Sequence, residues 1–200
     1  MEARSLMHRL DLRADALPAG GNWYPEDNVL EATLDLMNQH RPAKVLALNG
    51  GLAAAVLARA LRDMGALWLV EHDPQIIDVT RDMLRTIGSH APVTIIEAEL
   101  QDYDKHNMWY DRYVLGELPR DLDLIFIDGP PHFCGRTPRY PAGPELFHKL
   151  SPRGMVVLDK AKRVKEKKAL ARWGDEFPHL RQSRLKRGGG AVVLTADNTD

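Results

Sequence analysis

A short apolar run that ends in a glycine turn limits the folds open to this chain more than any other stretch. Residues 44–51 read K-V-L-A-L-N-G-G, and the apolar part is too short for a helix but suits a strand buried in a parallel sheet. The turn formed by Asn49, Gly50 and Gly51 ends the run, and residues 52–64 predict an alanine-rich helix. A strand, a glycine turn and a helix in this order offer free backbone N–H groups to a ligand.

An acid follows the next predicted strand. Residues 66–70 predict that strand, and Glu71 comes directly after it, 20 residues beyond Gly51. An acid at this distance, on the tip of the second strand, can accept hydrogen bonds from both hydroxyls of a ribose. We therefore expect a nucleoside-binding α/β domain in which Glu71 holds the ribose, rather than an ordinary exposed acid.

The remaining pattern predicts strands that alternate with helices. Asp73 suits a helix N-cap, Pro74 a first helical position and Gly88 a helix stop. Residues 101–116 are polar and aromatic and carry no clear period. The expected helices cover residues 27–40, 74–87, 145–150 and 164–173; the expected strands cover residues 93–96, 122–127 and 155–158, and a final hairpin covers residues 180–185 and 191–194.

This order of elements predicts the fold class. Five strands that alternate with helices and are closed by a hairpin imply a doubly wound α/β fold, with a mostly parallel seven-stranded sheet and one antiparallel strand. The terminal hairpin and the absence of G-x-G-x-x-G disfavour a nicotinamide-dependent oxidoreductase.

Length and composition indicate one globular domain. We expect residues 1–26 to be an N-terminal extension or lid and residues 27–200 to be a single domain. In the extension, Trp23 and Tyr24 either cover a ligand or pack a loop onto the body. One cysteine, a charged N-terminus and no apolar run of about 20 residues predict a cytoplasmic protein without a membrane span.

Charge is distributed unevenly along the chain. The net charge of -1 argues against bulk nucleic-acid affinity, yet residues 149–187 hold thirteen Lys or Arg against four Asp or Glu. This basic third is either a solvated helix face or a surface that meets an anionic substrate.

Several motifs together resemble class I S-adenosylmethionine-dependent methyltransferases, specifically small bacterial ones whose fourth strand ends D-G-P-P. The resemblance covers the chain from about Gly20 to Leu194. It rests on the glycine turn, E-H-D-P at residues 71–74, W-Y-D at 109–111, L-I-F-I-D-G-P-P at 124–131, R-Y-P at 139–141 and V-V-L-D at 156–159.

The resemblance implies S-adenosyl-L-methionine as cofactor and assigns residues to its parts. The turn would hold the methionine part, Glu71 the ribose and His72 the adenine. The full set implied for cofactor binding is Asn49, Gly50, Gly51, Glu71, His72, Glu99, Leu100 and Asp128, with Glu99 and Leu100 bordering the adenine and Asp128 beside the transferring methyl group.

The chain departs from the family pattern at the glycine motif. That motif usually reads acid-x-Gly-x-Gly, whereas this chain has Ala47 at the acid position and Asn49 at the first glycine. Asn adopts positive φ more readily than most residues, so the turn can survive the change. The missing acid removes a group that commonly helps to order the amino end of the cofactor.

A second departure concerns metal ions. Metal-dependent O-methyltransferases of this fold carry one Asp after strand four and an Asp-Asp or Asp-Asn pair after strand five. Here Asp128 and Asp159 fit, but Lys160 takes the third position, and an ammonium cannot ligate Mg²⁺. We expect no metal site, and the hypothesis is that Lys160 supplies the positive charge; otherwise it is a surface lysine.

The resemblance implies methyl transfer to an oxygen or nitrogen of a small molecule. Asp128, Asp159 and His132 are the candidate bases, and Lys160 completes the catalytic set. A carboxylate, phosphate or sugar-phosphate substrate would suit the basic loop residues Arg136, Arg139, Lys160, Lys162 and Arg163. The alternatives are a binding or scaffold protein that has lost catalysis and a nucleic-acid methyltransferase. The sequence is also compatible with a homodimer.

Overall fold

A seven-stranded sheet forms the centre of the protein. The computed structural model describes residues 6, 8–12 and 27–196. The strand order is β3-β2-β1-β6-β7-β9-β8, and β9 runs antiparallel to both of its neighbours while the other pairings are parallel. The sheet strands are β1 (Lys44–Leu48), β2 (Ala66–Glu71), β3 (Val93–Glu97), β6 (Leu122–Ile127), β7 (Leu150–Leu158), β8 (Leu180–Arg184) and β9 (Val192–Ala196). The predicted fold class is confirmed.

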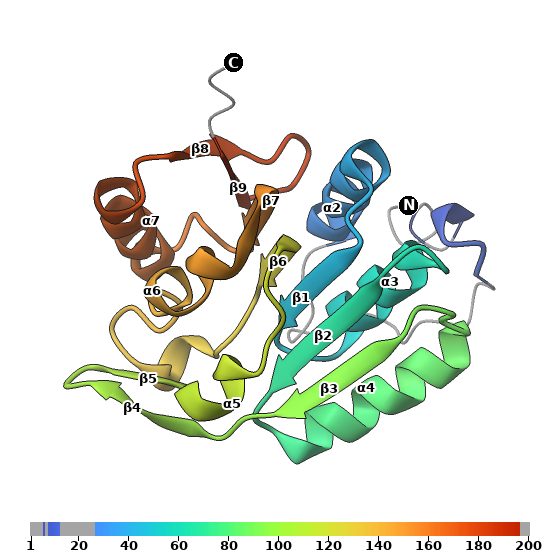
Figure 1. Ribbon diagram of the computed structural model, residues 1–200, viewed down its shortest axis with the longest axis horizontal. Helices are drawn as coiled ribbons and strands as arrows, with labels where there is room; N and C mark the ends of the chain where they lie inside the picture. Colours follow the sequence, from blue (N-terminus) through green and yellow to red (C-terminus); the bar gives the residue numbers. More distant parts are fainter. Residues whose placement is uncertain (1–5, 7, 13–26, 197–200) are drawn as a thin grey trace.

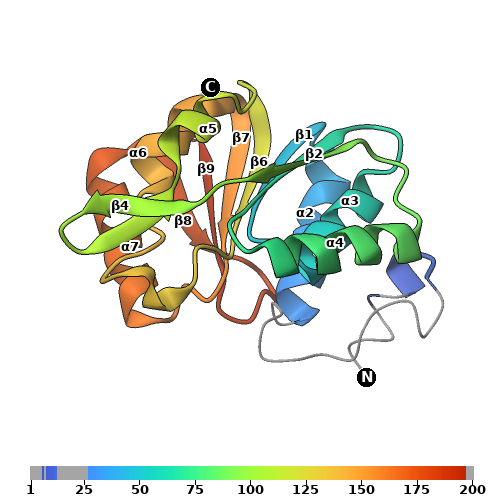
Figure 2. The ribbon, with the colours of Figure 1, turned by 90° about the horizontal axis from the view of Figure 1, so that it is seen from below.

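Helices cover both faces of this sheet. Figure 2 shows α2, α3 and α4 on one face and α5, α6 and α7 on the other. The helices are α2 (Asp27–His40), α3 (Leu52–Leu61), α4 (Pro74–Ile87), α5 (Arg112–Gly116), α6 (Ala142–Leu146) and α7 (Val164–Glu176), with short 3-10 turns η1 (His132–Cys134) and η2 (Phe147–Lys149). The chain order can be followed by colour in Figure 1.

The alternation of side chains along the strands divides the core into two clusters. Successive residues of a strand point to opposite faces, so Val45 and Ala47 pack with α2 and α3 while Leu46 and Leu48 pack towards α6 and α7. Both sets are fully buried, which explains why the central strands read as continuous apolar runs.

The register brings four strand ends to one level. Leu48 is paired with Val70 on one side and with Ile127 on the other, and Ile127 is paired with Leu158. The next residue of each strand therefore emerges at the same edge of the sheet. These residues are Glu71, Asn49, Asp128 and Asp159, in spatial order across β2, β1, β6 and β7.

Two predicted helix boundaries are wrong. The helix expected over residues 52–64 ends at Leu61, because Arg62 has a φ of 51° and Met64 is exposed. The helix expected over residues 145–150 is instead α6 followed by η2. Leu150 already belongs to β7, which begins before the predicted strand at residue 155.

Residues 101–116, which carry no clear period in the sequence, contain most of a β-hairpin. β4 (Leu100–Asp104) and β5 (Asn107–Tyr110) pair antiparallel beside the main sheet, and α5 follows. Trp109 and Tyr110 are fully buried against the α6–α7 side of the core, so the polar-looking segment hides two large aromatic side chains.

Near the N-terminus, Leu6 and Leu10 are buried in the cluster that contains α2 and α3. Trp23 and Tyr24 lie outside the described residues. The proposed division at residue 26 therefore stays a prediction. Among the helices that the structure describes, none is long and apolar enough to cross a membrane.

Candidate functional site

The turn after β1 has the backbone form that the sequence predicted. Asn49 has a φ of 95° and Gly51 a φ of 77°. A Cβ on Gly50 would lie 2.6 Å from Thr80 Oγ1 and 2.9 Å from Ile76 Cγ2, so only glycine fits there without movement of α4. The turn is thus held closely against the first two turns of α4.

The amides of this turn are not free, contrary to expectation. The N–H of Asn49 donates to the Val70 carbonyl at 3.0 Å, and the N–H of Gly51 donates to Thr80 Oγ1 at 2.7 Å. The N–H of Gly50 donates to Glu71 Oε2 at 2.8 Å. The second strand and α4 satisfy donors that a ligand was expected to use, which the local sequence pattern could not reveal.

Glu71 is a buried and fully engaged carboxylate. Its side chain has no exposed surface, and its Oε1 accepts the backbone N–H groups of His72 at 2.6 Å and Asp73 at 2.9 Å. Burial opposes its ionisation, but the side chain of His72 and the amides of Gly50, Asp73 and His72 outweigh burial and lower the pKa. Glu71 is therefore not an ordinary exposed acid.

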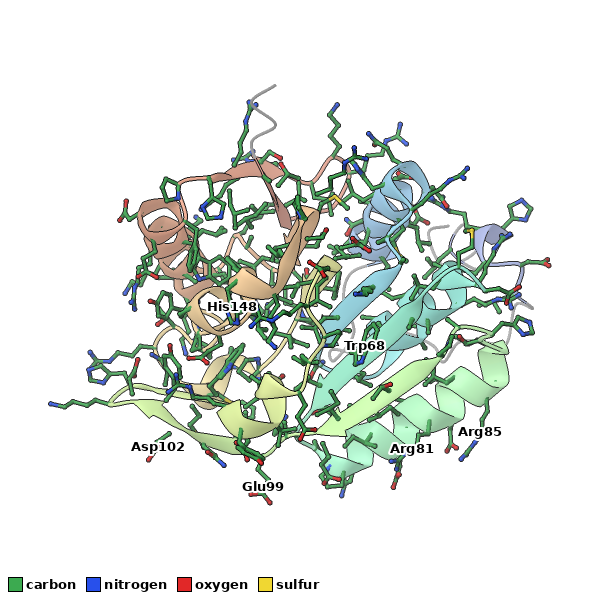
Figure 3. The ribbon with its side chains drawn as sticks, viewed as in Figure 1. Trp68, Arg81, Arg85, Glu99, Asp102 and His148 are labelled. Atoms are coloured by element: carbon green, nitrogen blue, oxygen red, sulfur yellow. The ribbon has the colours of Figure 1, made fainter. Side chains whose placement is uncertain are left out.

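The three residues expected to border the adenine, His72, Glu99 and Leu100, differ from one another in burial and direction. His72 is half-buried, with Nδ1 2.8 Å from Glu71 Oε1 and its ring 6.2 Å from the ring of Tyr110. Leu100 is half-buried at the start of β4. Glu99 is exposed, and its side chain points away from the body (Figure 3). The structure brings His72 to the site and directs the carboxylate of Glu99 outward.

Asp128, Asp159 and Lys160 form a charged cluster at the neighbouring strand ends. Lys160 Nζ lies 2.8 Å from Asp128 Oδ1 and 3.4 Å from Asp159 Oδ2. Both carboxylates are buried, whereas the lysine side chain is 20% exposed. Burial, and then the charge of Asp128, raise the pKa of Asp159, while Lys160 and Arg139 partly offset them.

Arg139 anchors this cluster from within the core. Its Nη2 donates to the Asp128 carboxylate at 2.9 Å and also to the Asp128 carbonyl, and its Nη1 donates to the Asp159 carbonyl at 2.9 Å. Its Nε lies 3.7 Å from Oε1 of the buried Glu166. The expectation that Arg139 meets a substrate is wrong, because its side chain is only 3% exposed and holds the ends of β6 and β7 together.

Tyr110 is a site residue that sequence reasoning missed. Its ring is fully buried, and its hydroxyl is without a hydrogen-bond partner in the part of the chain that the structure describes. A Cβ on Gly129 would collide with that hydroxyl and would lie 3.0 Å from Asn49 Cβ. The hydroxyl therefore sits between the ends of β1 and β6, where the strand order reverses. Burial and then the charge of Glu71 raise its pKa well above the usual value.

A hollow of about 350 Å³ lies at the start of α7, and Glu166, which contacts Arg139, is one of its lining residues. His132, Arg163, Val164, Lys165 and Glu166 line it. The ring of His132 is exposed there and no described contact joins it to Asp128. His132, predicted as a candidate base together with Asp128 and Asp159, therefore has no direct contact with Asp128 among the described residues.

A larger cavity of about 730 Å³ is remote from these residues. It lies between α2, α3 and the segment around Leu10. No predicted site residue lines it, so the carboxyl edge of the sheet remains the candidate site.

The donor set at the carboxyl edge does not suit a metal ion. Within residues 6, 8–12 and 27–196 there is no group of three or more His, Cys, Asp or Glu side chains that could hold one. Lys160 Nζ stands between the two aspartates instead, and its positive charge would repel a cation.

Solved structures of methyltransferases share this architecture. An SAH-bound methyltransferase from Podospora anserina is 15% identical, with 98% of this chain and 88% of that chain covered and a TM-score of 0.64. An O-methyltransferase from Streptomyces achromogenes in complex with SAM is 14% identical, with 98% and 88% covered and a TM-score of 0.62. An O-methyltransferase from Bacillus cereus in complex with SAH is 16% identical, with 98% and 90% covered and a TM-score of 0.59. At these identities the likeness shows the fold.

A search of curated proteins finds no match to the sequence. A family profile described as a methyltransferase domain matches residues 48–161, which is more than half of the chain and includes the turn, Glu71 and the charged cluster. The chain therefore belongs to the methyltransferase-domain family.

Proposed function

We propose that this protein uses S-adenosyl-L-methionine to methylate an oxygen or nitrogen atom of a small molecule. The observation that carries the proposal is the pairing of Glu71 with the Gly50 amide beside the point where the strand order reverses. Ligands of open α/β sheets bind at that point, outside the carboxyl ends of the strands. The SAM- and SAH-bound neighbours of the same fold support this choice of cofactor.

The residues at this edge fit such a cofactor. Among the described residues, Glu71 Oε2 accepts one hydrogen bond, from Gly50, so the oxygen retains a lone pair for a ribose hydroxyl. The buried Tyr110 hydroxyl has no hydrogen-bond partner within residues 6, 8–12 and 27–196, so it can bond a polar group of a ligand. In the proposal Glu71 holds the ribose, His72 borders the adenine and the turn at Asn49 and Gly50 borders the methionine part.

In this proposal the charged cluster of Asp128, Asp159 and Lys160 acts on the substrate atom that accepts the methyl group. When bound, S-adenosyl-L-methionine would supply an activated methyl group, carried on a positively charged sulfur that would be its leaving group. A hydroxyl acceptor must also lose its proton, and Asp159, with its raised pKa, is the proposed proton acceptor. Asp128 holds Lys160, and the exposed His132 is the alternative base.

The hollow at the start of α7 is the proposed position of the substrate. Arg163 and Lys165 both line it, which favours a substrate with a carboxylate or phosphate group. Lys165 Nζ already donates to the carbonyls of His132 and Gly135 at 2.6 Å, so Arg163 is the better candidate for a direct contact.

Calorimetry with S-adenosylmethionine and its demethylated product tests the proposal. The wild-type chain should bind one molecule of either, and Glu71→Ala should bind about tenfold or more weakly because the carboxylate acceptors are lost. Glu97→Ala is the matched control, since Glu97 is paired with Glu71 across β2 and β3 but is exposed. Failure of the wild-type chain to bind either molecule would reject the proposal.

A binding protein without catalysis is the second candidate. The observation that favours it is the closure of the site: Glu71 has no exposed surface and the turn amides already have partners. Such a protein would bind neither S-adenosylmethionine nor its demethylated product in this closed site, and it would transfer no methyl group to hydroxy acids, phenols or sugar phosphates. Methyl transfer to any of these substrates would exclude it.

A further inference from the structure

Two buried carboxylates meet at adjacent strand ends in this protein. Ile127 of β6 is paired with Leu158 of β7, so Asp128 and Asp159 emerge side by side. They are only 6% and 1% exposed. Two like charges in a buried position need a cation between them, because each carboxylate disfavours the ionisation of the other.

Lys160 is folded back to provide that cation. Its backbone is in the left-handed region, with a φ of 55°, and its N–H donates to Asp159 Oδ1 at 2.6 Å. This conformation turns the side chain towards the strand ends, where Nζ contacts Asp128 Oδ1 at 2.8 Å. A freely solvated surface lysine would need neither contact.

The charge balance of the cluster depends on this lysine. Asp128, Asp159 and Glu166 are opposed by Arg139 and Lys160, which leaves a formal charge of −1. Without the ammonium the formal charge becomes −2. Arg139 is bonded to two backbone carbonyls in the core, so Lys160 is the cation of this pair that reaches solvent.

We propose that Lys160 is a built-in cation that occupies the position of a divalent metal ion between Asp128 and Asp159, and that its ammonium binds an electron-rich oxygen of the substrate. The proposal deepens the proposed function, on which its substrate part rests. It predicts an enzyme that needs no metal ion and a site that becomes metal-binding when the ammonium is replaced by an oxygen ligand.

The test is a titration of the intact chain with Mn²⁺. The electron paramagnetic resonance signal of free Mn²⁺ measures how much of the ion is bound. Lys160→Asn supplies a third oxygen ligand, and Asn tolerates the left-handed backbone at this position. Lys160→Met removes the same charge without adding a ligand and is the matched control. We expect Lys160→Asn to bind one Mn²⁺ at least about tenfold more tightly than Lys160→Met or the wild-type chain. Adding Asp159→Asn to Lys160→Asn should abolish the gain.

Two results would overturn the proposal. The first is that Lys160→Asn, folded by circular dichroism, binds Mn²⁺ no better than Lys160→Met. The second is that the wild-type chain binds Mn²⁺ and loses it in the single variant Asp159→Asn, because the site would then hold a metal despite the lysine. Cofactor-product binding is measured separately on the same samples, so failure of the proposed function leaves the metal result readable.

Discussion

The backbone N–H of Gly50 donates to Glu71 Oε2 at 2.8 Å, which joins the turn after β1 to the tip of β2 across 21 residues of chain. Both groups are buried, so the bond is shielded from water. The same carboxylate also accepts the amides that open the connection to α4. One side chain thus fixes the shape of the proposed nucleoside site.

Replacing this carboxylate with an amide should destabilise the protein. In Glu71→Gln one side-chain oxygen becomes an NH₂ group, which cannot accept from the backbone amides. We expect the free energy of unfolding at pH 7 to fall by about 2 kcal/mol, as for a buried hydrogen-bonded charge. Urea unfolding measures the change. Glu97→Gln, an exposed position on the adjacent strand, should stay near the wild-type value, and an equal loss in both variants would refute the assignment.

The lowered pKa of Glu71 predicts a specific pH dependence of stability. A group whose pKa is lower in the folded than in the unfolded state stabilises the fold above its unfolded pKa, about 4.3 for glutamate. That contribution is lost as the pH falls through the lowered folded pKa. The wild-type free energy of unfolding should therefore decline more steeply below about pH 4.3 than that of Glu71→Gln. Parallel pH profiles for the two proteins would contradict the prediction.

A methyl group at the turn should loosen the contact with α4. Gly50→Ala places a Cβ 2.6 Å from Thr80 Oγ1, the atom that accepts the Gly51 amide. We expect a loss of roughly 1–3 kcal/mol in unfolding free energy, as for other overpacked sites, together with weaker cofactor binding. Gly116→Ala is the control, since a Cβ there meets no atom within 4 Å. Equal melting temperatures for Gly50→Ala and Gly116→Ala would show that the turn is not closely packed against α4.

The variant Tyr110→Phe distinguishes an effect on stability from an effect on ligand binding. Tyr110→Phe removes a buried polar group that has no partner among the described residues, so the melting temperature should stay the same or rise. Affinity for S-adenosylhomocysteine should fall about fivefold if the hydroxyl bonds the ligand, which corresponds to roughly 1 kcal/mol. Unchanged affinity in a stable variant would remove Tyr110 from the site.

The sequence predicted the positions that depend on local order along the chain. The distance from the turn to Glu71 identified the acid, and the apolar runs identified the strands that carry Asp128 and Asp159. The partners of these residues come from distant segments: α4 supplies Thr80 to the turn, and the loop before α6 supplies Arg139 to the cluster. No period or spacing in one sequence encodes such contacts.

The hairpin of β4 and β5 was missed for a different reason. Its strands have only five and four residues, and its turn residues are Lys105 and His106 rather than glycine. Packing decides its conformation, since Trp109 and Tyr110 are buried while Met108 between them and the turn is exposed. Tyr110 could therefore be recognised as a site residue only from its position in space.

A crystal structure of the wild-type protein with S-adenosylhomocysteine would show whether Glu71 and the turn after β1 form the nucleoside site. We predict that the ligand lies across Asn49, Gly50 and Gly51, with a ribose hydroxyl within hydrogen-bond distance of Glu71 Oε2. A saturated crystal in which Glu71 keeps its present partners and the ligand lies elsewhere, or does not bind, would contradict it.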